Sequence, residues 1–463
     1  DRVGNPGARG VVHAETSLMD GIANQKILVL GLGATGRSAA NFCIARGANV
    51  LAADERAEDL SAGLEKLDPR VDRIFGKPFP DAGDFDLVVP SPGVPPERYR
   101  KRAKRVWGDI ELAYRSISAP IIAVTGTNGK STTVCLLEAL LGAAGARARA
   151  AGNLGKPALE LVGEPLDFAV LEISSFQLES VETFRPAVAV ILNITPDHLD
   201  RHASFDDYAS AKARLLANQR STDTAVLNLD DPTVAAFAET ASGRVFPFRT
   251  RGAVSPGACL DAGAAVLCEK GAAPIRISLD AMQLTGFHNR ENVLAALAAV
   301  YAAGVDPVRA ADALASFANL PHRSEFVGQV RGVRYIDDSK ATNPGAAIRS
   351  LAGFAEDLIW IAGGRDKNLA FEELADAAVK RVRAAVLIGE SAKKLEAALA
   401  GRVDVYGAAS IEEAVRRASE LARPGDAVLL SPACASQDQF RNFQERGERF
   451  RAAVGELQTR EMP

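Results

Sequence analysis

Short runs of aliphatic and β-branched residues alternate along the chain with longer segments of helical periodicity, a pattern typical of parallel α/β sheets. The alternation begins at residues 27–30, starts again at 121–124 and starts a third time at 333–336. A stretch rich in lysine and arginine at 98–105 precedes the second start, and Asn319-Leu320-Pro321 precedes the third. The pattern therefore predicts three α/β domains.

The chain length agrees with several domains, because 463 residues exceed a common domain size of roughly 100–200 residues. We expect a disordered leader over residues 1–24 and domains over 25–112, 113–319 and 320–463. The first and third should be Rossmann-like, and the central one a parallel-sheet domain of the P-loop ATPase type. Further strands are expected at 49–53, 86–89, 168–171, 188–193, 225–229, 358–362, 384–388 and 427–430, with short strands within 243–285 and a helix at 289–303.

Composition and charge exclude several classes of protein. The formal net charge of −4 at pH 7 disfavours a protein that binds nucleic acid along a whole face. The longest apolar stretch, 293–303, is shorter than the roughly 20 residues of a membrane span, and the first two dozen residues lack the apolar core of a secretory signal. Five widely spaced cysteines without a C-x-x-C pair argue against disulfides and against a zinc knuckle. We expect a reduced, cytoplasmic protein with no membrane span and no nucleic-acid partner.

The most specific motif is Thr125-Gly-Thr-Asn-Gly-Lys-Ser-Thr132, which stands between a predicted strand and a predicted helix. Unpaired backbone N–H groups at such a junction bind phosphates. Lys130 would contact the β- and γ-phosphates of a triphosphate, and Ser131 or Thr132 would bind Mg²⁺. Val124 stands where the P-loop pattern has a glycine, so a plain glycine turn is the alternative. The residues expected at ATP through this loop are Gly126, Thr127, Asn128, Gly129, Lys130, Ser131 and Thr132.

A second glycine motif, Gly31-x-Gly33-x-x-Gly36, is followed about twenty residues later by Asp54 and matches the dinucleotide-binding fingerprint. Such glycines let the backbone approach a pyrophosphate closely, and any nucleotide diphosphate meets that geometry. A tight turn that serves only helix–strand packing is the alternative. The motif alone leaves NAD and other nucleotides open.

Two groups in the central domain follow predicted strands, Glu172 after 168–171 and Asp197-His198 after 188–193. Ligands of open α/β sheets bind beyond the carboxyl ends of the strands. If both strands flank the one that feeds the phosphate loop, a carboxylate and an imidazole reach the phosphates and can hold magnesium. Taken singly, Glu172 could be an exposed strand end and His198 a structural histidine. Composition alone makes Lys212, in a helical segment over 208–217, a solvated lysine.

Seven signatures follow one another along the chain. They are Thr125-Gly-Thr-Asn-Gly-Lys-Ser-Thr132, Glu172-Ile-Ser-Ser-Phe-Gln177, Asn193-Ile-Thr-Pro-Asp-His-Leu-Asp200, Gly286-Phe-His-Asn289, Leu320-Pro-His-Arg323, Asp337-Asp-Ser-Lys-Ala-Thr-Asn343 and Leu430-Ser-Pro-Ala-Cys-Ala-Ser436. Together these motifs resemble those of the Mur ligases of peptidoglycan precursor synthesis, and the resemblance runs from about residue 26 to 450. The last two motifs resemble most the family member that adds D-glutamate to UDP-N-acetylmuramoyl-L-alanine.

The resemblance implies an ATP-dependent, ADP-forming ligase whose substrates are UDP-N-acetylmuramoyl-L-alanine and glutamate, with D-glutamate favoured. ATP would convert the substrate carboxylate to an acyl phosphate, and the glutamate amine would attack it to form a tetrahedral intermediate. Two Mg²⁺ ions, a carbamylated Lys212 and a monomeric protein are also expected. The third domain would close about a hinge near Asn319-Leu320-Pro321. The sequence itself leaves the handedness of the glutamate open.

The resemblance also assigns residues to each ligand. The metal and catalytic set is Lys130, Ser131, Glu172, His198 and Lys212. Further ATP-binding residues are Asn289, His322, Arg323, Asp338 and Lys340. The UDP-sugar substrate would contact Gly31, Gly33, Thr35, Gly36, Asp54, Arg56, Ser91, Gly93, Asn153, Ser174 and Gln177. The incoming glutamate would contact Thr342, Lys367, Ser436 and Phe443. The chain departs from the family at Glu55, where a neutral residue is common.

Three other classes fit parts of the chain. A nicotinamide-dependent oxidoreductase would use the loop at 31–36 and keep the second loop as a regulatory nucleotide site, but no hydride-accepting site is recognisable. A nonenzymatic P-loop switch would need neither Lys367 nor Ser436. A ligase of the folylpolyglutamate synthetase type shares the central chemistry, but its substrate would leave the N-terminal glycine loop without a role.

Overall fold

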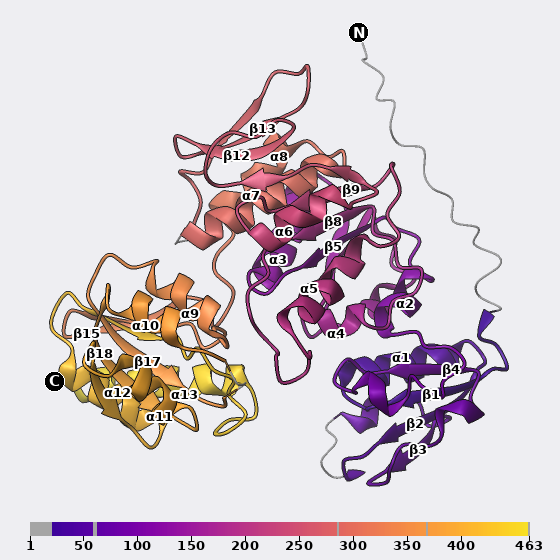
Figure 1. Ribbon diagram of the computed structural model, residues 1–463, viewed down its shortest axis with the longest axis horizontal. Helices are drawn as coiled ribbons and strands as arrows, with labels where there is room; N and C mark the ends of the chain where they lie inside the picture. The colour runs from indigo at the N-terminus through magenta and orange to yellow at the C-terminus, as the bar shows by residue number, and fades with distance from the viewer. Residues whose placement is uncertain (1–20, 59–62, 285–286, 367–368, 462–463) are drawn as a thin grey trace. The chain divides into compact units, whose positions relative to one another are not determined.

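The computed structural model describes residues 21–58, 63–284, 287–366 and 369–461, which form two compact units. The first unit holds the described residues up to 194 together with 209–281 and 292–314. The second holds 195–208, the described part of 282–291 and the chain from 315 onward. Each of the three predicted α/β domains contains one parallel or mainly parallel sheet, so the predicted fold class is confirmed (Figure 1).

The N-terminal sheet has the strand order β3-β2-β1-β4, with all neighbours parallel. This is the order of one half of a Rossmann fold. Helix α1 (Ala34–Ala45) packs against β1 and β2, and the opposite face buries Leu28, Val88 and Tyr99. The edge strand β3 was not expected, because its four residues are all partly or fully exposed and show no apolar run. The strands are β1 (Lys26–Leu30), β2 (Asn49–Asp54), β3 (Asp72–Phe75) and β4 (Leu87–Pro90).

The central sheet is also parallel throughout, with the order β10-β9-β8-β5-β7-β6. Strand β5 lies between β7 and β8, so the two strands that carry the predicted metal ligands flank the strand that feeds the phosphate loop. The strands are β5 (Ile121–Thr125), β6 (Ala148–Gly152), β7 (Phe168–Glu172), β8 (Val188–Ile191), β9 (Thr224–Leu227) and β10 (Arg244–Val245). The helices are α2 (Asp109–Tyr114), α3 (Lys130–Ala143), α4 (Ser175–Leu178), α5 (Phe205–Ala213), α6 (Pro232–Ala236), α7 (Phe287–Ala302) and α8 (Pro307–Ala310).

A small separate sheet accounts for the short strands expected within 243–285. Its order is β11-β12-β13-β14, and only the first pair is parallel. The strands are β11 (Phe248–Arg249), β12 (Gly257–Asp261), β13 (Ala264–Cys268) and β14 (Ile275–Ser278).

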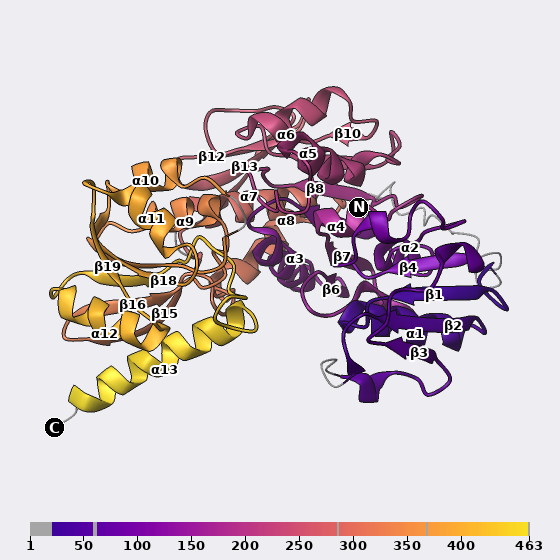
Figure 2. The same cartoon turned by 60° about the horizontal axis from the view of Figure 1, so that its bottom comes forward.

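The C-terminal sheet lies between two layers of helices (Figure 2). Its order is β15-β16-β20-β17-β18-β19, in which only the edge strand β15 runs antiparallel. Side chains of α9, α10 and α11 cover one face, around Trp360, and those of α12 and α13 cover the other. The strands are β15 (Glu325–Val330), β16 (Val333–Asp337), β17 (Leu358–Gly363), β18 (Val382–Ile388), β19 (Asp404–Gly407) and β20 (Ala427–Leu430). The helices are α9 (Pro344–Leu351), α10 (Glu372–Ala378), α11 (Ala392–Leu399), α12 (Ile411–Leu421) and α13 (Phe443–Glu461).

No helix among the described residues combines the length and the apolar character that a membrane span needs.

A buried carboxylate anchors α2 in the first unit. Glu111 has no exposed surface, and its two oxygens accept hydrogen bonds from the backbone N–H groups of residues 182–184 and from Thr183 Oγ1. Arg115 donates to Glu111 Oε1 at 2.7 Å from one turn further along α2. A buried charge is tolerated only when such partners satisfy it. Glu111 therefore ties α2 to the loop that precedes β8.

The substitution Glu111→Gln should lower the free energy of unfolding by about 2–4 kcal/mol, because the amide would turn an N–H toward backbone donors that now share a carboxylate. Urea denaturation followed by circular dichroism measures the change. Glu182→Gln is the matched control, since the Glu182 side chain is more than half exposed and contacts the same Arg115. Equal effects of the two substitutions would contradict the anchoring role of Glu111.

Candidate active site

The phosphate loop spans residues 126–129, between β5 and α3, and has no spare volume. Gly126 and Gly129 have φ angles of 150° and 86°, which favour glycine. A Cβ atom on Gly129 would lie 2.3 Å from Asn292 Oδ1. Asn193 braces the loop: its backbone O accepts from Thr127 N, its Oδ1 accepts from Asn128 N, and its Nδ2 donates to Asn128 O.

Two lysine side chains meet at one carbonyl of this loop. Lys130 Nζ donates to the backbone O atoms of Gly126 and Thr127, each at 2.8 Å. Lys212 Nζ donates to Gly126 O at 2.9 Å from α5, and the residue is only 1% exposed. The expectation from composition alone, that Lys212 is a solvated lysine, is therefore wrong. Ser131 and Thr132 are buried in the first turn of α3.

Glu172 ends β7 and is 2% exposed. Asn153 fixes it, since Asn153 Nδ2 donates to Glu172 Oε1 at 2.8 Å and Asn153 N donates to its backbone O. The other carboxylate oxygen, Oε2, is buried without a hydrogen-bond partner among the described residues. A buried carboxylate oxygen that lacks a donor suits a cation. The predicted metal ligand Glu172 thus has the environment that a magnesium ligand needs.

A hydrogen-bonded chain runs from a buried aspartate to the predicted substrate residue Ser174. Asp109 Oδ2 accepts from Gln177 Nε2 at 2.8 Å, and Gln177 Oε1 accepts from both the N and the Oγ of Ser174 at 3.0 Å. Ser174 Oγ in turn accepts from Gln177 N and caps α4. Both ends of the Gln177 amide are therefore used within the protein.

His198 lies on the segment 195–208, which belongs to the second unit. Its backbone is left-handed with φ 56°, and its Nε2 lies 3.7 Å from Asp197 Oδ2. Asp197 is buried, and its Oδ2 accepts from Asn343 Nδ2 at 2.9 Å. The motif that holds His198 and the Asp337–Asn343 motif are thus joined directly within the second unit.

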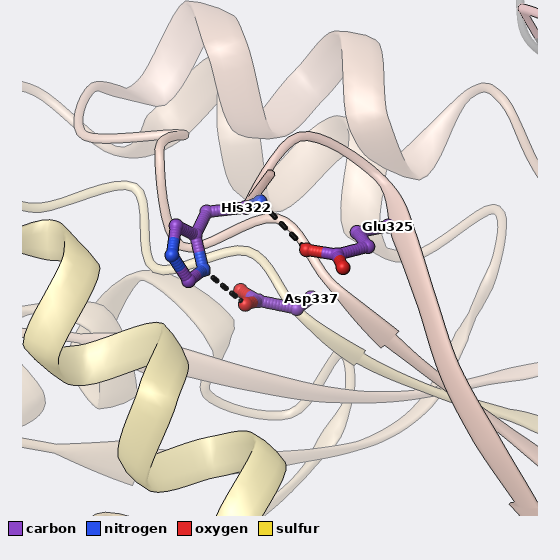
Figure 3. Close-up of side chains that lie close together, drawn as sticks. All are labelled: His322, Glu325 and Asp337. Carbon is purple, nitrogen blue, oxygen red and sulfur yellow. Dashed lines mark hydrogen bonds and ion pairs between the residues drawn. The ribbon is translucent and has the colours of Figure 1, made fainter. Parts of the chain in front are cut away.

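Three acidic or imidazole side chains gather where β15 and β16 meet (Figure 3). One potential ligand atom from each of His322, Glu325 and Asp337 lies within 4.8 Å of the other two. Hydrogen bonds already use these atoms: His322 Nδ1 is 2.7 Å from Asp337 Oδ2, and Glu325 accepts from His322 N and from Arg451. The hydrogen bond to Asp337 raises the pKa of the His322 imidazole against the opposing effect of burial. The group is therefore a buried, hydrogen-bonded histidine–aspartate pair whose backbone is held by Glu325.

Of the other predicted residues of the second unit, Phe443 contacts both the His322 ring and Lys340. Lys340 Nζ lies 4.0 Å from the ring centroid of Phe443, and the His322 ring meets the same phenyl edge-on at 6.1 Å. Burial raises the pKa of Asp338 to about 7, although the hydrogen bond that Ser324 N donates to Asp338 Oδ1 opposes the shift. Arg323 and Thr342 are half-buried near these residues in sequence, and Ser436 is buried in the loop after β20. Asn289, on α7, is buried with Nδ2 3.5 Å from Asn319 Oδ1. Lys367 lies outside the described residues.

The N-terminal glycine loop joins three predicted substrate residues. Gly31 has φ 80°, and its O accepts from Ser91 Oγ at 2.7 Å. A Cβ atom on Gly36 would lie 1.8 Å from Gly31 O, so this turn requires glycine. Asp54 accepts from Leu32 N and from Arg56; burial raises its pKa, but these hydrogen bonds outweigh burial and hold it at about 2. Gly33 caps α1, Thr35 lies in its first turn, and Gly93 is exposed in the turn after β4.

Comparison with known proteins finds relatives that match most of the chain. The family models for the Mur ligase MurD-like N-terminal domain, the Mur ligase middle domain and the Mur ligase glutamate ligase domain match residues 25–104, 124–300 and 322–434. The UDP-N-acetylmuramoylalanine–D-glutamate ligase of Geotalea daltonii is 45% identical over 450 residues, which cover 94% of this chain and 98% of that protein. The chain belongs to the Mur ligase family. The ligase of the same name from Geobacter metallireducens is 44% identical over 96% of this chain and all of its own.

Solved structures of Mur ligases share the fold. The UDP-N-acetylmuramate-alanine ligase MurC of Thermotoga maritima superposes with a TM-score of 0.61 at 19% identity, covering 94% of this chain and 100% of its own. MurF of Acinetobacter baumannii gives the same score at 20% identity, covering 94% of this chain and 93% of its own.

In this Mur ligase several residues that were not predicted from the sequence hold the loops that carry the predicted site residues. Asn193 follows β8 at the start of a recognised motif, so its position beyond a strand end was a usable signal. Asp337 stands beside the predicted Asp338, and nothing in the sequence distinguishes the two. Arg446 is fully buried and donates to the backbone O atoms of Ser339, Cys434 and Ala435. Only the fold brings that arginine to two motifs about 100 residues apart.

The buried carboxyl group of Asp109 should make the free energy of unfolding depend on pH. Burial raises its pKa to about 6, with the hydrogen bond from Gln177 opposing, whereas the ordinary pKa of an aspartate is 3.8. Between these pH values the folded protein holds a proton that the unfolded chain releases, so this group lowers stability as pH rises through the window. Asp109→Asn keeps an acceptor for Gln177 and removes the charge. It should raise the free energy of unfolding by about 1–3 kcal/mol at pH 8 and by much less at pH 4.

Urea denaturation at the two pH values measures this difference. Asp109→Leu is the control, because it removes the charge and also the acceptor, and should therefore gain less than Asp109→Asn. A stability gain that is the same at pH 4 and pH 8 would refute the buried charge as its cause.

Proposed function

We propose that this chain joins D-glutamate to the alanyl carboxylate of UDP-N-acetylmuramoyl-L-alanine, with ATP converted to ADP and phosphate. The observation that carries the proposal is the identity of 45% over nearly the full length with a relative named for this reaction. The phosphate loop with two lysines and a buried carboxylate is the machinery that such a reaction needs.

A free carboxylate is a poor acyl donor, so its activation is the first step. One carboxylate oxygen attacks the γ-phosphorus of ATP, and the bond from that phosphorus to the β,γ-bridging oxygen breaks to release ADP. The uncharged glutamate amine attacks the carbonyl carbon of the acyl phosphate. The tetrahedral intermediate then loses phosphate, and the amine proton leaves to solvent, which gives the amide. Phosphoryl transfer of this kind depends mainly on positioning and charge neutralisation. We assign the charge neutralisation on the transferred phosphate to Lys130.

Magnesium fits the surroundings of Glu172 by the chemistry of the donors there. We propose that Glu172 Oε2, which lacks a hydrogen-bond partner, and Ser131 hold one Mg²⁺, and that His198 and a carbamylated Lys212 serve a second. Bound Mg²⁺ would neutralise phosphate charge and orient the γ-phosphate for transfer. Carbamylation would turn the buried Lys212 from a cation into an anion, which such a metal favours.

The remaining assignments are proposals from the same resemblance. Asn153, Ser174 and Gln177 serve the muramoyl-alanine part of the substrate, while the N-terminal loop at 31–36 with Asp54, Arg56, Ser91 and Gly93 serves its UDP part. The ATP residues outside the phosphate loop are Asn289, His322, Arg323, Asp338 and Lys340. Thr342, Lys367, Ser436 and Phe443 receive glutamate, whose two carboxylates suit a lysine and hydroxyl groups.

We also propose that the chain acts as a monomer in the cytoplasm. Its five cysteines form no disulfide, which agrees with a reducing compartment.

A coupled assay of phosphate release tests the function. Phosphate should appear only when ATP, UDP-N-acetylmuramoyl-L-alanine and D-glutamate are all present, and L-glutamate and other amino acids should not replace D-glutamate. Release that needs only ATP would indicate a nucleotide switch. Turnover with a folate and glutamate, and without the UDP-sugar, would indicate a folylpolyglutamate synthetase.

Lys130→Ala should lower kcat by roughly 10² or more, because the transferred phosphate loses its neutralising ammonium in the transition state. Lys130→Arg, which keeps the charge but not the compact ammonium, should recover part of the rate. The thermal melting profile should stay near that of the wild type. Near wild-type turnover of Lys130→Ala would remove the phosphate-loop assignment.

Lys212→Ala should be nearly inactive, and short carboxylates such as acetate should restore part of the activity if the missing group is an anion. Chloride at equal ionic strength is the control. The electron density of a nucleotide-bound crystal structure would show directly whether Lys212 is carbamylated. An unmodified lysine in that density, or a Lys212→Ala variant that acetate does not rescue, counts against carbamylation.

A further inference from the structure

The pair formed by His322 and Asp337 is among the most enclosed polar contacts of the second unit. Asp337 ends β16 with no exposed surface, and the side chain of His322 is about one-tenth exposed. Asp337 Oδ2 lies 2.7 Å from His322 Nδ1, and Asp337 Oδ1 accepts from Ser339 N at 2.8 Å. One carboxylate therefore holds both a ring and the start of the loop that carries Lys340.

Helix α13 covers this pair closely and can do so only because Gly447 is a glycine. A Cβ atom there would lie 2.2 Å from His322 Nδ1 and 2.5 Å from Asp337 Oδ2. Glycine in the middle of a helix is normally unfavourable relative to alanine. The close approach of the helix backbone excludes water from the hydrogen bond, so the bond is stronger than it would be at the surface.

The backbone of His322 is held as firmly as its ring. Its φ of 63° is left-handed, which costs a non-glycine residue free energy and persists only where other contacts enforce it. Its N donates to Glu325 Oε2 at 2.9 Å, and its O accepts from Lys340 N at 3.1 Å. The side chains of His322 and Lys340 both lie beside the phenyl ring of Phe443.

We propose that Asp337 is a positioning residue which fixes the His322 ring with Nδ1–H on the carboxylate, so that the ring binds anionic groups of the nucleotide only when Nε2 is protonated as well. This inference rests on the proposed function, in which His322 and Lys340 serve ATP. In this proposal Asp337 acts on the nucleotide through His322.

An ionised carboxylate can only accept hydrogen bonds, so the Nδ1 atom that faces Asp337 must carry a proton. With Nδ1–H committed to Asp337, a neutral ring has a bare lone pair on Nε2, which repels phosphate oxygens. The cationic ring carries an N–H at that nitrogen and attracts them. The described residues supply no hydrogen bond to Nε2.

The charged groups packed against the ring come from two strands and one helix. Asp337 on β16 and Glu325 on β15 favour the cation, while Arg451 on α13 opposes it. The net effect is a raised pKa of His322, caused mainly by the hydrogen bond that its Nδ1–H donates to Asp337. The stabilising effect of the pair is therefore complete below the ordinary histidine pKa and is lost as pH rises through the raised one.

Nuclear magnetic resonance of the ligand-free full chain tests the pair directly. The chain has five histidines, so ¹⁵N-labelled imidazoles give few signals, and the signal lost in His322→Gln identifies His322. In the wild type its pKa should lie above that of a free histidine. In Asp337→Asn the amide must serve Ser339 N with its oxygen and offer Nδ2–H to the ring, so the pKa should fall and the neutral ring should carry its proton on Nε2. An unchanged pKa in Asp337→Asn would overturn the proposal.

Binding of ADP at fixed Mg²⁺, measured by calorimetry between pH 7 and 9, tests the consequence. Wild-type affinity should fall by about tenfold as the ring loses its charge, since a hydrogen bond to a charged group is at stake. Asp337→Asn should show a flat profile. Glu325→Gln is the matched control, because it removes a nearby charge, keeps an acceptor for His322 N and should retain the pH dependence. The same slope in Asp337→Asn as in the wild type would overturn the proposal.

Substitution of two glycines on α13 tests the proposal a second time without changing any charged side chain. Gly447→Ala places a methyl group against the pair and should weaken ADP binding and lower the pKa of His322. Gly455→Ala, on the same helix with nothing within 4 Å of its Cβ, should change neither. Equal behaviour of the two variants would contradict the proposal. Because these readouts need no ligation, a chain that binds ADP in this pH-dependent way without forming the amide would refute the proposed function and leave this inference standing.

Discussion

The parallel order of β8, β5 and β7 is the constraint on which the chemistry of the first unit depends. Parallel strands that are neighbours end at one edge, so residues about 125, 172 and 192 along the chain arrive together. The backbone groups beyond these ends have no strand partner and need other donors and acceptors. The Asn193 side chain bonds the backbone N and O of Asn128 in the phosphate loop, and the Asn153 side chain donates to the Glu172 carboxylate. The loop is thus shaped before any ligand arrives.

Several buried charges in this fold cost stability and are kept near the proposed sites. Lys212 directs an ammonium to Gly126 O, and Asp109 keeps a carboxylate where burial favours its protonated form. Arg446 has its pKa lowered to about 10, chiefly by burial, while it holds two loops of the second unit. Charges in such surroundings are found most often at functional sites, because stability alone would select apolar residues there. Their positions agree with the ligase chemistry proposed here.

Hydrophobic patterning predicted the strands that lie in the middle of the sheets and missed several at their edges. Strands β5, β7 and β8 are fully or almost fully buried and form apolar runs, whereas neither β3 nor β19 has a buried residue. A pattern of burial can be read only where burial is strong. The predicted fold class is correct for that reason, because the central strands define it.

The candidate site was predictable where a residue type has a fixed place in a motif and was not predictable where its role depends on packing. Lys130 stands at the head of a recognisable loop, and its position in the structure agrees with that reading. The burial of Lys212 could not be read from a polar helical segment, and only resemblance raised it above a surface lysine. The contact of Gly447 with His322 and Asp337 joins residues more than 100 positions apart and follows from helix packing alone.

The central claim is that ATP activates the substrate carboxylate as an acyl phosphate. The most direct test uses UDP-N-acetylmuramoyl-L-alanine with ¹⁸O in both oxygens of its terminal carboxylate, followed by mass spectrometry of the phosphate released during ligation. Attack of a carboxylate oxygen on the γ-phosphorus predicts one ¹⁸O atom in each phosphate molecule. Phosphate without the label, formed together with the amide product, would contradict the account.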